Sequence, residues 1–412
     1  MAMQPATASH LESTLRMQMD AADWTWHQRR NLARSPTVTL GCLGQFQSRL
    51  HQHLAALGRY GADAVPLAME GLMDPIAGYG FAAGWTLLHQ SQATMAKTVV
   101  EATRSSEGRH RLGLFGALAS SNRPEVSTQI AALAREPVSV LSALAMETLC
   151  RLGKAEAIRP LVMQRLLEGD AEITAILWKA AEWFPSGTIP QSAFTYALTH
   201  APAETDENRI LETAALHRQS WILDWCRNPS LIPAHQRARL RWLAVLGGDV
   251  DADLLRRHRT LLGEEYHALL ALHGYRGHLE EIIEDLGNDD PRISVRAGLA
   301  FQRMTGVNVE SDVRVEIPPE DGTEPDAVDR EFQPLGFLPD QSRAKDAQQS
   351  LPTDVRPNDR FVAGQVVTLD TPFPGTGDCE AAWSYRLRRW MARENADRPG
   401  SDIVLISAMR IP

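Results

Sequence analysis

The chain has 412 residues, which is too long for one ordinary hydrophobic core but suits a stack of repeated units that adds core with every unit. Its hydrophobic fraction of 44% and charged fraction of 23% are ordinary for a soluble globular protein and exclude a wholly disordered chain. The net charge of -9 lies mainly in residues 310–360, which hold roughly 13 acidic and 6 basic residues, so the remainder is close to neutral and lacks the long basic stripe of a nucleic-acid-binding protein.

Residues 1–60 are expected to form a pair of helices that caps the first unit of a repeat array. A capping box of Ser9 and Glu12 predicts the start of the first helix, which continues to Arg34. The Ser-Pro-Thr motif at 35–37 predicts a break, and a second helix is expected at about 39–58. The two predicted apolar faces are Leu11, Leu15, Met19, Ala22 and Trp26, and then Leu43, Phe46, Leu50, Leu54 and Leu57.

Residues 61–309 are predicted to be helical repeats. An Ala/Leu-rich helical run begins after each of three dipeptides that end in proline, namely Asp74-Pro75, Glu136-Pro137 and Ile232-Pro233. Weaker breaks, marked by polar residues, fall near residues 105, 170 and 205. The starts recur at roughly 30 to 34 residues, a period typical of helical solenoids. The sequence therefore predicts an all-α fold, a HEAT-like α-solenoid of stacked helix pairs. The alternative is an irregular all-α domain without a true repeat.

For two helices in this region, the sequence predicts both the position of an end and the buried face. Asp290 is expected to cap a helix that has Pro291 in its first turn and ends at Gly306. An earlier helix is expected to stop at Gly153. Their apolar stripes are Ile293, Ala297, Ala300, Phe301 and Met304 in the first and Leu141, Leu144, Ala145, Thr148, Leu149 and Leu152 in the second.

The helical pattern breaks after Val309. Residues 310–355 are rich in Pro, Gly and acidic side chains without a period, which predicts a linker or an extended strap. Four apolar residues are expected to anchor it: Phe332, Leu335, Phe337 and Leu338. Residues 356–412 predict a small α+β element, with a strand at 360–369, a helix capped by Asp378 that presents Trp383, Leu387, Trp390 and Met391, and a second strand at 402–409.

The cysteines and the hydropathy pattern bear on where the protein works. The four cysteines form no CxxC pair, so we expect buried, reduced thiols at Cys42, Cys150, Cys226 and Cys379. No apolar run approaches the length of about 18 residues that a membrane span needs, and the N-terminus lacks the apolar core of a secretory signal. These features favour a cytoplasmic protein with no membrane partner.

No set of residues predicts an enzyme, a cofactor or a metal site. The Gly-Thr-Gly motif at 375–377 lacks the third glycine and the strand and helix of a phosphate loop. The best metal candidates are three histidines near glutamates, which we interpret instead as polar residues on an exposed face and turn: His267, His273 and His278. Four acidic residues are likewise interpreted as solvated helix positions: Glu147, Glu172, Glu182 and Asp224.

Basic and aromatic clusters in the middle of the chain are the candidates for binding. Six arginines lie on helices expected to be adjacent, namely Arg237, Arg239, Arg241, Arg256, Arg257 and Arg259. Because acidic residues lie between the two sets, we favour a solvated, salt-bridged face over a protein-binding patch, and either over a nucleic-acid site. Five tryptophans also gather here, and core packing is favoured for Trp178, Trp221 and Trp225, with Trp183 and Trp242 nearby.

The chain resembles a family of HEAT-like bacterial proteins that is often encoded in type VI secretion gene clusters. The resemblance rests on residues 21–57, with an aromatic helix and a proline-containing break, on residues 290–310 with the acidic segment after them, and on residues 356–369 followed by an arginine-rich helix. It covers nearly the whole chain and brings no catalytic motif. It implies a Gram-negative bacterium and proximity to secreted toxins.

The expected function is therefore a non-enzymatic interaction solenoid. The first hypothesis is an immunity protein that neutralises a type VI effector toxin, for example a nuclease, and the alternative is an accessory or adaptor protein that loads an effector. A HEAT-type DNA-binding enzyme is the third. The expected partner-binding residues are Glu182, Trp183, Asp206, Glu207, Trp221, Asp224, Trp225, Arg237, Arg241 and Asp249.

Overall fold

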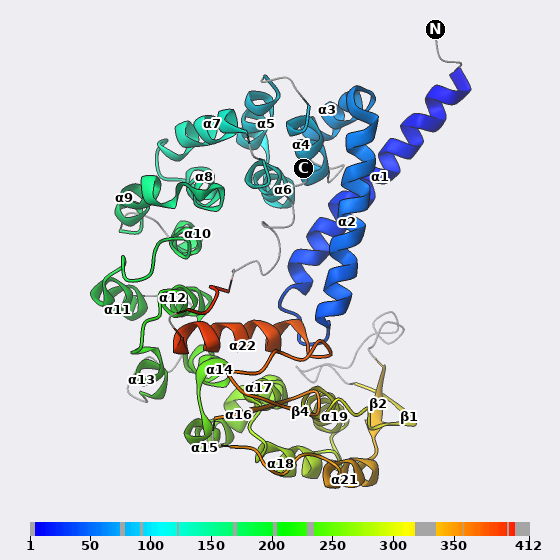
Figure 1. The fold of residues 1–412 in the computed structure, drawn as a ribbon, viewed down its shortest axis with the longest axis vertical. Coiled ribbons are helices and arrows are strands. Elements are labelled where there is room, and N and C mark those ends of the chain that lie inside the picture. Colours follow the sequence, from blue (N-terminus) through cyan, green and yellow to red (C-terminus); the bar gives the residue numbers. More distant parts are fainter. Residues whose placement is uncertain are drawn as a thin grey trace. The chain divides into compact units, whose positions relative to one another are not determined.

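The chain folds into two compact, mostly helical units with two small antiparallel sheets (Figure 1). The computed structural model describes residues 5–74, 79–90, 94–121, 123–167, 171–200, 204–228, 235–317, 335–356, 358–393 and 395–399. Unit 1 comprises the described residues of 5–33 and 42–219, and unit 2 comprises those of 34–41 and 220–399. The all-α prediction is confirmed. This division differs from the sequence-based one, which placed 61–309 in a single region.

The N-terminal helices of unit 1 are α1 (Pro5–Leu32) and α2 (Leu40–Tyr60), whose first two residues belong to unit 2. The predicted capping box is wrong, because Ser9 lies inside α1 rather than before it. The apolar face of α1 is largely buried, and Trp26 stacks on Phe81 with ring centroids 4.6 Å apart. Asp23 accepts a hydrogen bond of 2.9 Å from the Phe81 N–H, which satisfies a backbone donor in the first turn of α4 (Gly80–Leu88).

Alternate helices of unit 1 pack against one another: α4 against α6, α6 against α8, α8 against α10, and α10 against α12. A Cβ at Gly84 would lie 2.9 Å from Ala117 Cβ, so the small residue permits the close approach of α4 and α6. Gly153 lies within the π-type segment Cys150–Lys154 that follows α8, and its φ of 77° breaks the helix there, as predicted. The other helices are α3 (Val65–Met73), α5 (Thr94–Ser105), α6 (Gly108–Ala119), α7 (Pro124–Ala134), α8 (Val140–Leu149), α9 (Ala155–Arg165), α10 (Ala171–Ala181), α11 (Gln191–His200) and α12 (Glu204–Leu216).

Some predicted helix starts are shifted. Asp74 follows the last residue of α3, and α4 begins only at Gly80. Glu136 and Pro137 precede α8 by a short turn, and Ser139 forms the cap instead. Pro75, Asp170 and the Ile232-Pro233 pair lie outside the described residues. The prediction of a break near Ser105 is confirmed by the end of α5.

Unit 2 is organised around α19 (Pro291–Thr305), where the sequence prediction holds in detail. The Asp290 carboxylate accepts from the Arg292 N–H at 2.9 Å, and Gly306 adopts a left-handed φ of 73°. Of the predicted stripe, Ile293 is half-buried and the rest is buried. The helices that precede α19 are α13 (Ile222–Arg227), α14 (Gln236–Leu246), α15 (Ala252–Arg257), α16 (Arg259–Leu262), α17 (Tyr266–His273) and α18 (His278–Asp285).

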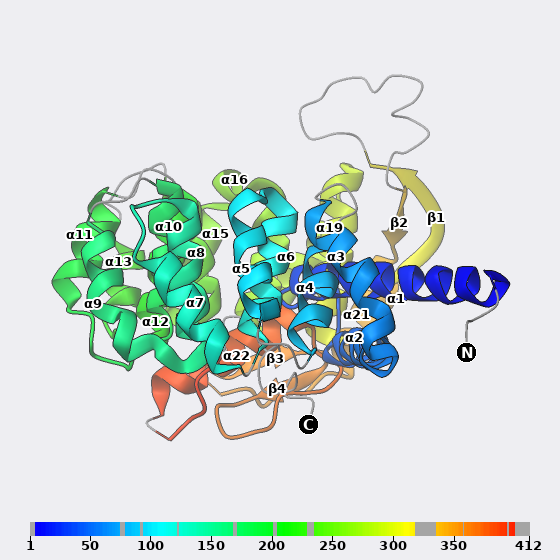
Figure 2. The ribbon, with the colours of Figure 1, turned by 90° about the horizontal axis from the view of Figure 1, so that it is seen from above.

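Residues 310–355 hold more regular structure than a linker. Strands β1 (Glu310–Glu316) and β2 (Leu335–Pro339) pair antiparallel, and β2 packs on α19, as Figures 1 and 2 show. Asp340 then caps α21 (Gln341–Gln349). Of the predicted anchors, Phe337 is half-buried beneath the Arg314 guanidinium, whereas Phe332 and the side chain of Leu335 lie outside the described residues.

The C-terminal element begins with a hairpin where one strand was predicted. Strands β3 (Arg360–Val362) and β4 (Gln365–Val367) are joined by Ala363 and Gly364, both at positive φ, as a tight two-residue turn requires. Asp378 caps α22 (Cys379–Ala392) through the Ala381 N–H, which confirms the predicted cap. The predicted strand at 402–409 lies outside the described residues.

Arg360 joins this hairpin to the helices beneath it. Its buried guanidinium donates four hydrogen bonds, all to backbone carbonyls at the C-termini of α14 and α17: Ala244, Val245, Gly247 and Leu272. Such carbonyls have no partner within their own helix and carry the negative end of the helix dipole. They can therefore hold a buried cation without a carboxylate, although burial lowers the pKa of Arg360 well below its usual value.

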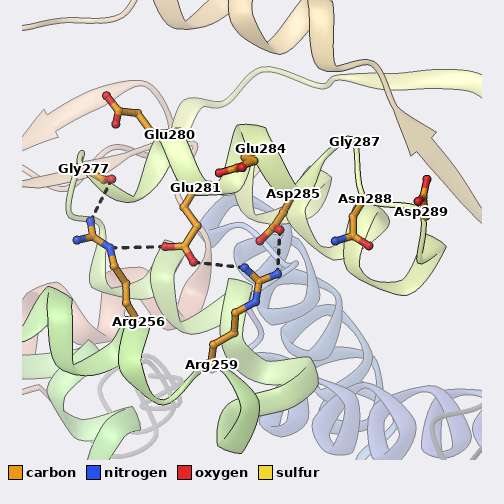
Figure 3. Close-up of a pocket in the computed structure, with 10 residues that line it drawn as sticks. All are labelled: Arg256, Arg259, Gly277, Glu280, Glu281, Glu284, Asp285, Gly287, Asn288 and Asp289. Carbon is orange, nitrogen blue, oxygen red and sulfur yellow. Dashed lines mark hydrogen bonds and ion pairs between the residues drawn. The ribbon is translucent and has the colours of Figure 1, made fainter.

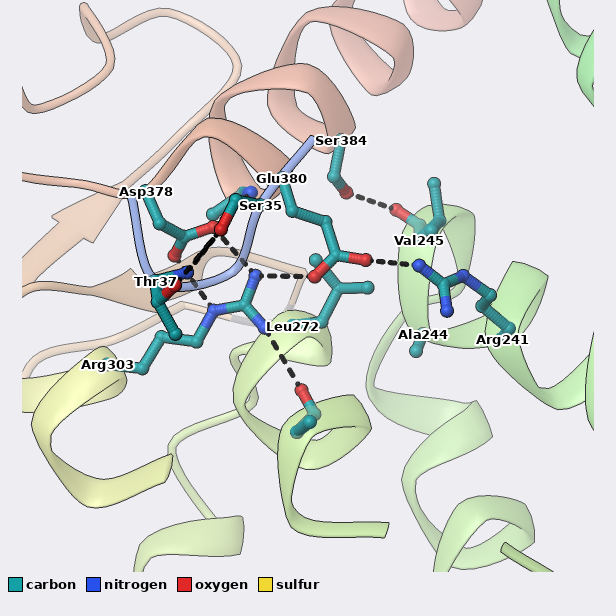
Figure 4. Close-up of polar contacts among 12 residues, drawn as sticks. Ser35, Thr37, Arg241, Ala244, Val245, Leu272, Arg303, Asp378, Glu380 and Ser384 are labelled. Carbon is teal, nitrogen blue, oxygen red and sulfur yellow. Dashed lines mark hydrogen bonds and ion pairs between the residues drawn. The ribbon is translucent and has the colours of Figure 1, made fainter. Parts of the chain in front are cut away.

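A buried ion network fixes the N-terminus of α22 (Figure 4). Arg303 on α19 donates to both oxygens of Asp378 at 2.8 and 2.9 Å and to Glu380 at 3.1 Å, and Glu380 also accepts from Arg241 at 2.5 Å. The Arg303, Asp378 and Glu380 side chains are each 8% exposed. Each buried charge of the network is thus paired with an opposite charge. The ion pairs also connect α14, α19 and α22.

The segment 34–41 between α1 and α2 packs onto the start of α22. The Cys379 N–H donates to the Val38 carbonyl at 2.9 Å, and Thr39 forms an antiparallel bridge with Asp378. Arg34 lies over the Trp383 ring at 4.4 Å. This connector therefore belongs to unit 2, although both flanking helices belong to unit 1.

Candidate functional site

The candidate site is a groove of about 920 Å³ in unit 2, between α15 and α16 on one wall and α18 with the turn after it on the other (Figure 3). Its lining is polar, with two arginines facing a series of acidic side chains. The residues are Arg256, Arg259, Gly277, Glu280, Glu281, Glu284, Asp285, Gly287, Asn288 and Asp289. We call it the acidic groove.

The local sequence explains why these acids face outward. On α18, Leu279, Ile282 and Ile283 are buried, so the helix has one apolar face against the core. Glu280 and Glu284 are four residues apart and share the opposite, exposed face. Asp289 follows in the exposed turn before α19.

Two carboxylates of the groove are held by arginines across it. Glu281 lies 3.5 Å from Arg256 and 3.4 Å from Arg259, and Asp285 accepts from Arg259 at 2.8 Å. Hydrogen bonding to Asp285 raises the pKa of Arg259 despite its partial burial. From beneath, the Tyr266 hydroxyl donates to Glu281 at 2.5 Å, and burial together with this hydrogen bond raises the Tyr266 pKa. The walls are thus tied together by paired charges.

Three carboxylates remain after this pairing. Among the described residues, Glu280, Glu284 and Asp289 form no hydrogen bond or ion pair through their side chains, and all three are exposed. Figure 3 shows Glu281 and Asp285 directed at the arginines, with the three remaining carboxylates outside that network. The groove therefore presents a surplus negative charge on a wall whose geometry is fixed by its paired members.

The three histidines are buried, which corrects their interpretation as exposed polar residues. His267 contacts Asp285 at 2.8 Å, and the His273 and His278 rings lie 3.0 Å apart between nitrogens. Burial lowers the pKa of all three, to about 3 for His278. In the part of the chain that the structure describes, no group of three or more His, Cys, Asp or Glu side chains could hold a metal ion.

Four of the predicted partner-binding residues lie in unit 1, and two of these are buried. Glu182 and Glu207 are only 3% and 1% exposed, so neither can contact a partner directly. Glu182 is paired with Arg209 at 3.3 Å. Asp206 and Trp183 are half-buried in the same unit. The interpretation of Glu147 and Glu182 as solvated is wrong, whereas Glu172 is exposed as expected.

The remaining predicted residues lie in unit 2 and mostly serve its own fold. Trp221 and Trp225 pack edge to face with centroids 6.4 Å apart, and Asp224 is exposed beside them. The other three bind partners within the unit: Arg237 the Leu261 carbonyl, Arg241 the Glu380 carboxylate, and Asp249 the Asn358 N–H.

Most arginines of the predicted basic cluster also bind groups within unit 2. Arg239 is buried and donates to the Asn228 carbonyl, while Arg256 and Arg259 bind the carboxylates of the acidic groove. Arg257 is exposed. These arginines therefore neutralise or cap other groups of the chain, as the favoured interpretation of a salt-bridged face expected. Cys42 is exposed, contrary to the expectation for it, whereas the other three thiols are buried.

Sequence reasoning missed the acidic groove. The signal was the run 278–290, with six acidic residues among apolar positions at helical spacing. The sequence interpretation treats these acids only as neighbours of the histidines.

Within the described residues, no helix is both long and apolar enough to cross a membrane. Comparisons with known protein families, curated proteins and solved structures found no match.

Proposed function

We propose that the protein is a non-enzymatic interaction protein that binds a basic protein partner through the acidic groove. The observation that supports this is the set of three exposed carboxylates, Glu280, Glu284 and Asp289, which have no partner among the described residues. Unpaired like charges close together repel one another in the free protein, and a cationic partner would relieve that repulsion.

The ion pairs across the groove support the same proposal. Arg256 and Arg259 hold Glu281 and Asp285 in place, so the neighbouring exposed acids start from a fixed helix face. A surface fixed before binding loses less conformational entropy when the complex forms. Charge complementarity would also raise the association rate, most strongly at low salt.

For unit 1 we propose the HEAT-like α-solenoid expected from the sequence. The packing of alternate helices, α4 on α6 through to α10 on α12, is the arrangement that stacked helix pairs produce. A solenoid presents an extended surface, which is a second candidate region for partner contacts. Trp183 and Asp206 in unit 1 are candidates for such contacts because neither side chain is fully buried.

The partner we propose is a type VI effector toxin, which the chain would neutralise in the cytoplasm as an immunity protein. A nuclease toxin fits best, because an enzyme that holds phosphates needs a cationic surface and the acidic groove could cover it. The alternative is an adaptor that loads an effector without inhibiting it. A DNA-binding enzyme is a poorer fit, because the unpaired carboxylates would repel phosphate.

The test is capture and protection with charge-reversed variants. The tagged full chain would be used to isolate its strongest partner from native lysate, and the partner would then be co-expressed with wild-type chain, with Glu280→Lys/Glu284→Lys/Asp289→Lys, or with Glu107→Lys/Glu125→Lys/Glu172→Lys. The second triple variant is the matched control, since its three positions are exposed, lie in unit 1 and have the same charge change.

If the protein is an immunity protein, we expect the partner to be toxic when it is expressed alone. Wild-type chain and the control variant should then protect the cells, whereas the groove variant should not. A partner that is not toxic, but still requires the groove, would replace immunity with the adaptor hypothesis. If the groove variant binds as tightly as wild type, the acidic groove is not the binding surface and the proposal is wrong.

A further inference from the structure

A second pocket of unit 2, of about 340 Å³, lies between α13, the end of α14 and the last turns of α22. Its apolar wall includes Leu223, Leu246 and Met391, and Arg388 and Asn358 contribute polar groups. The volume falls at the lower end of the range for small-molecule sites, which are mostly apolar with a few placed polar groups. None of the residues that line this pocket lines the acidic groove.

Arg388 is the unusual member of this pocket. Among the described residues its guanidinium forms one hydrogen bond, 2.9 Å to the Asn358 carbonyl, and no ion pair. The Arg388 side chain is half-buried, and burial lowers its pKa to about 10 although Asp359 and Asp249 lie near enough to oppose that shift. The side chain is therefore still cationic at neutral pH, and no carboxylate of the described residues lies within ion-pair distance of it.

The neighbouring Arg227 provides the contrast. It also lines the pocket, but its Nε and Nη2 atoms donate to the two oxygens of Asp251 at 2.7 and 2.9 Å. This paired geometry is the usual way in which arginine binds a carboxylate. The same fold thus supplies one arginine of the pocket with a carboxylate and leaves the other without one.

Two further polar groups face the same space. The Asn358 side-chain amide and the Ser220 hydroxyl line the pocket and form no hydrogen bond within the described part of the chain. Asn358 is held at φ 67° by its backbone N–H, which donates to Asp249 at 3.0 Å. The Asn358 side-chain amide packs against Gly248. A Cβ at position 248 would collide with Asn358 Oδ1, so only glycine leaves room for the amide there.

We propose that this pocket binds a small carboxylate that carries a short apolar chain. The carboxylate would accept from Arg388 and from the Asn358 amide or the Ser220 hydroxyl, and the chain would pack on Leu223, Leu246 and Met391. The ligand would supply an anion in direct contact with the half-buried guanidinium and would remove apolar surface from water. This site is independent of the acidic groove and of the function proposed for it.

The first experiment is isothermal titration calorimetry of the full chain with three probes. Hexanoate carries both features, hexan-1-ol only the apolar chain, and inorganic phosphate only the charge. We expect hexanoate to bind at least about tenfold more tightly than either of the others, since a charge-assisted hydrogen bond is worth more than 1.4 kcal/mol. Equal binding of hexanoate and hexan-1-ol, stronger binding of phosphate, or no binding of hexanoate at millimolar concentration would overturn the proposal.

Variants then locate the site. Arg388→Met should weaken hexanoate about tenfold or more and leave hexan-1-ol unchanged. Because this substitution changes a half-buried residue, a second pair of variants uses an exposed position: Val250 lines the pocket yet is 81% exposed, so Val250→Lys and Val250→Asp should fold normally. Lysine should tighten hexanoate binding and aspartate should weaken it, each by a few fold. If the two variants bind hexanoate with equal affinity, hexanoate does not bind in this pocket.

Discussion

The acidic groove and the ion network at the start of α22 use the same two residue types for different ends. In the network, Arg303 and Arg241 share Asp378 and Glu380, and the acidic and basic groups are equal in number. In the groove two arginines face five acids, and the unpaired acids are exposed. Balanced and buried charges fix one helix against another, whereas a surplus at the surface stabilises nothing in the free chain and is available to a partner.

The largest effect is expected from breaking the network. Arg303→Met leaves the buried Asp378 without its arginine partner and Glu380 with Arg241 alone, so the free energy of unfolding should fall by about 3 to 5 kcal/mol. Guanidinium titration followed by tryptophan fluorescence would measure it. Arg256→Met is the matched control from the groove, where the partially exposed ion pair should contribute about 1 kcal/mol or less. Equal losses in the two variants would remove the distinction between the regions.

Arg360 should show the next largest effect. Arg360→Met leaves carbonyls at the C-termini of α14 and α17 unpaired, with an expected loss of about 2 to 4 kcal/mol. Arg360→Lys should recover part of it, since an ammonium group can reach fewer of the four carbonyls. The same denaturant titration would compare the two variants with wild type. If Met and Lys are equally stable, the carbonyl contacts are not what Arg360 supplies.

Acidification should weaken the interior of unit 2 through His278. The folded-state pKa of His278 is about 3, below the value of 6.5 for an unfolded histidine, so the unfolded chain binds more protons between these values. Stability from this residue is complete above pH 6.5 and declines as the pH falls towards 3, by about 3 kcal/mol at pH 4.5. Unfolding titrations from pH 7 to 4.5 would measure it, and His278→Gln should flatten the profile. A wild-type stability independent of pH in that range would contradict this account.

The smallest effect on stability is expected in the groove. The Glu280→Lys/Glu284→Lys/Asp289→Lys variant changes only exposed side chains without partners among the described residues, so stability should change by less than about 0.5 kcal/mol per site. Thermal unfolding by circular dichroism would test this. A large loss of stability would show that these acids serve the fold, in which case their role would resemble that of the α22 network.

Sequence reasoning succeeded where the determinants are local. The start, stop and buried stripe of α19 follow from Asp290, Pro291 and Gly306 and from helical spacing, all within a few turns of one another. It failed for polar residues whose surroundings depend on distant helices. Glu182 and the three histidines belong to residue types that are usually exposed, and nothing near them in the chain indicates the helices that cover them.

The same limit applies to the candidate site. Arg256 and Arg259 were recognised as part of a basic cluster, and Glu281 and Asp285 as acids, but their pairing follows from the packing of α15 and α16 beside α18. Without knowing which carboxylates are paired, the sequence alone does not distinguish the unpaired acids Glu280, Glu284 and Asp289 from the paired ones. The strands of residues 310–355 were missed for a related reason, because β1 is stabilised by β2 and by α19 rather than by its own sequence.

The connector at 34–41 also constrains the order in which the protein can mature on the ribosome. The Val38 carbonyl is synthesised about 340 residues before the Cys379 N–H that it binds. At ordinary elongation rates the interval is on the order of tens of seconds, ample time for the helices of unit 1 to fold first. The connector's contacts in unit 2 would then form only after α22 has been synthesised, and a ribosome that stalls before α22 would leave this segment without its binding site.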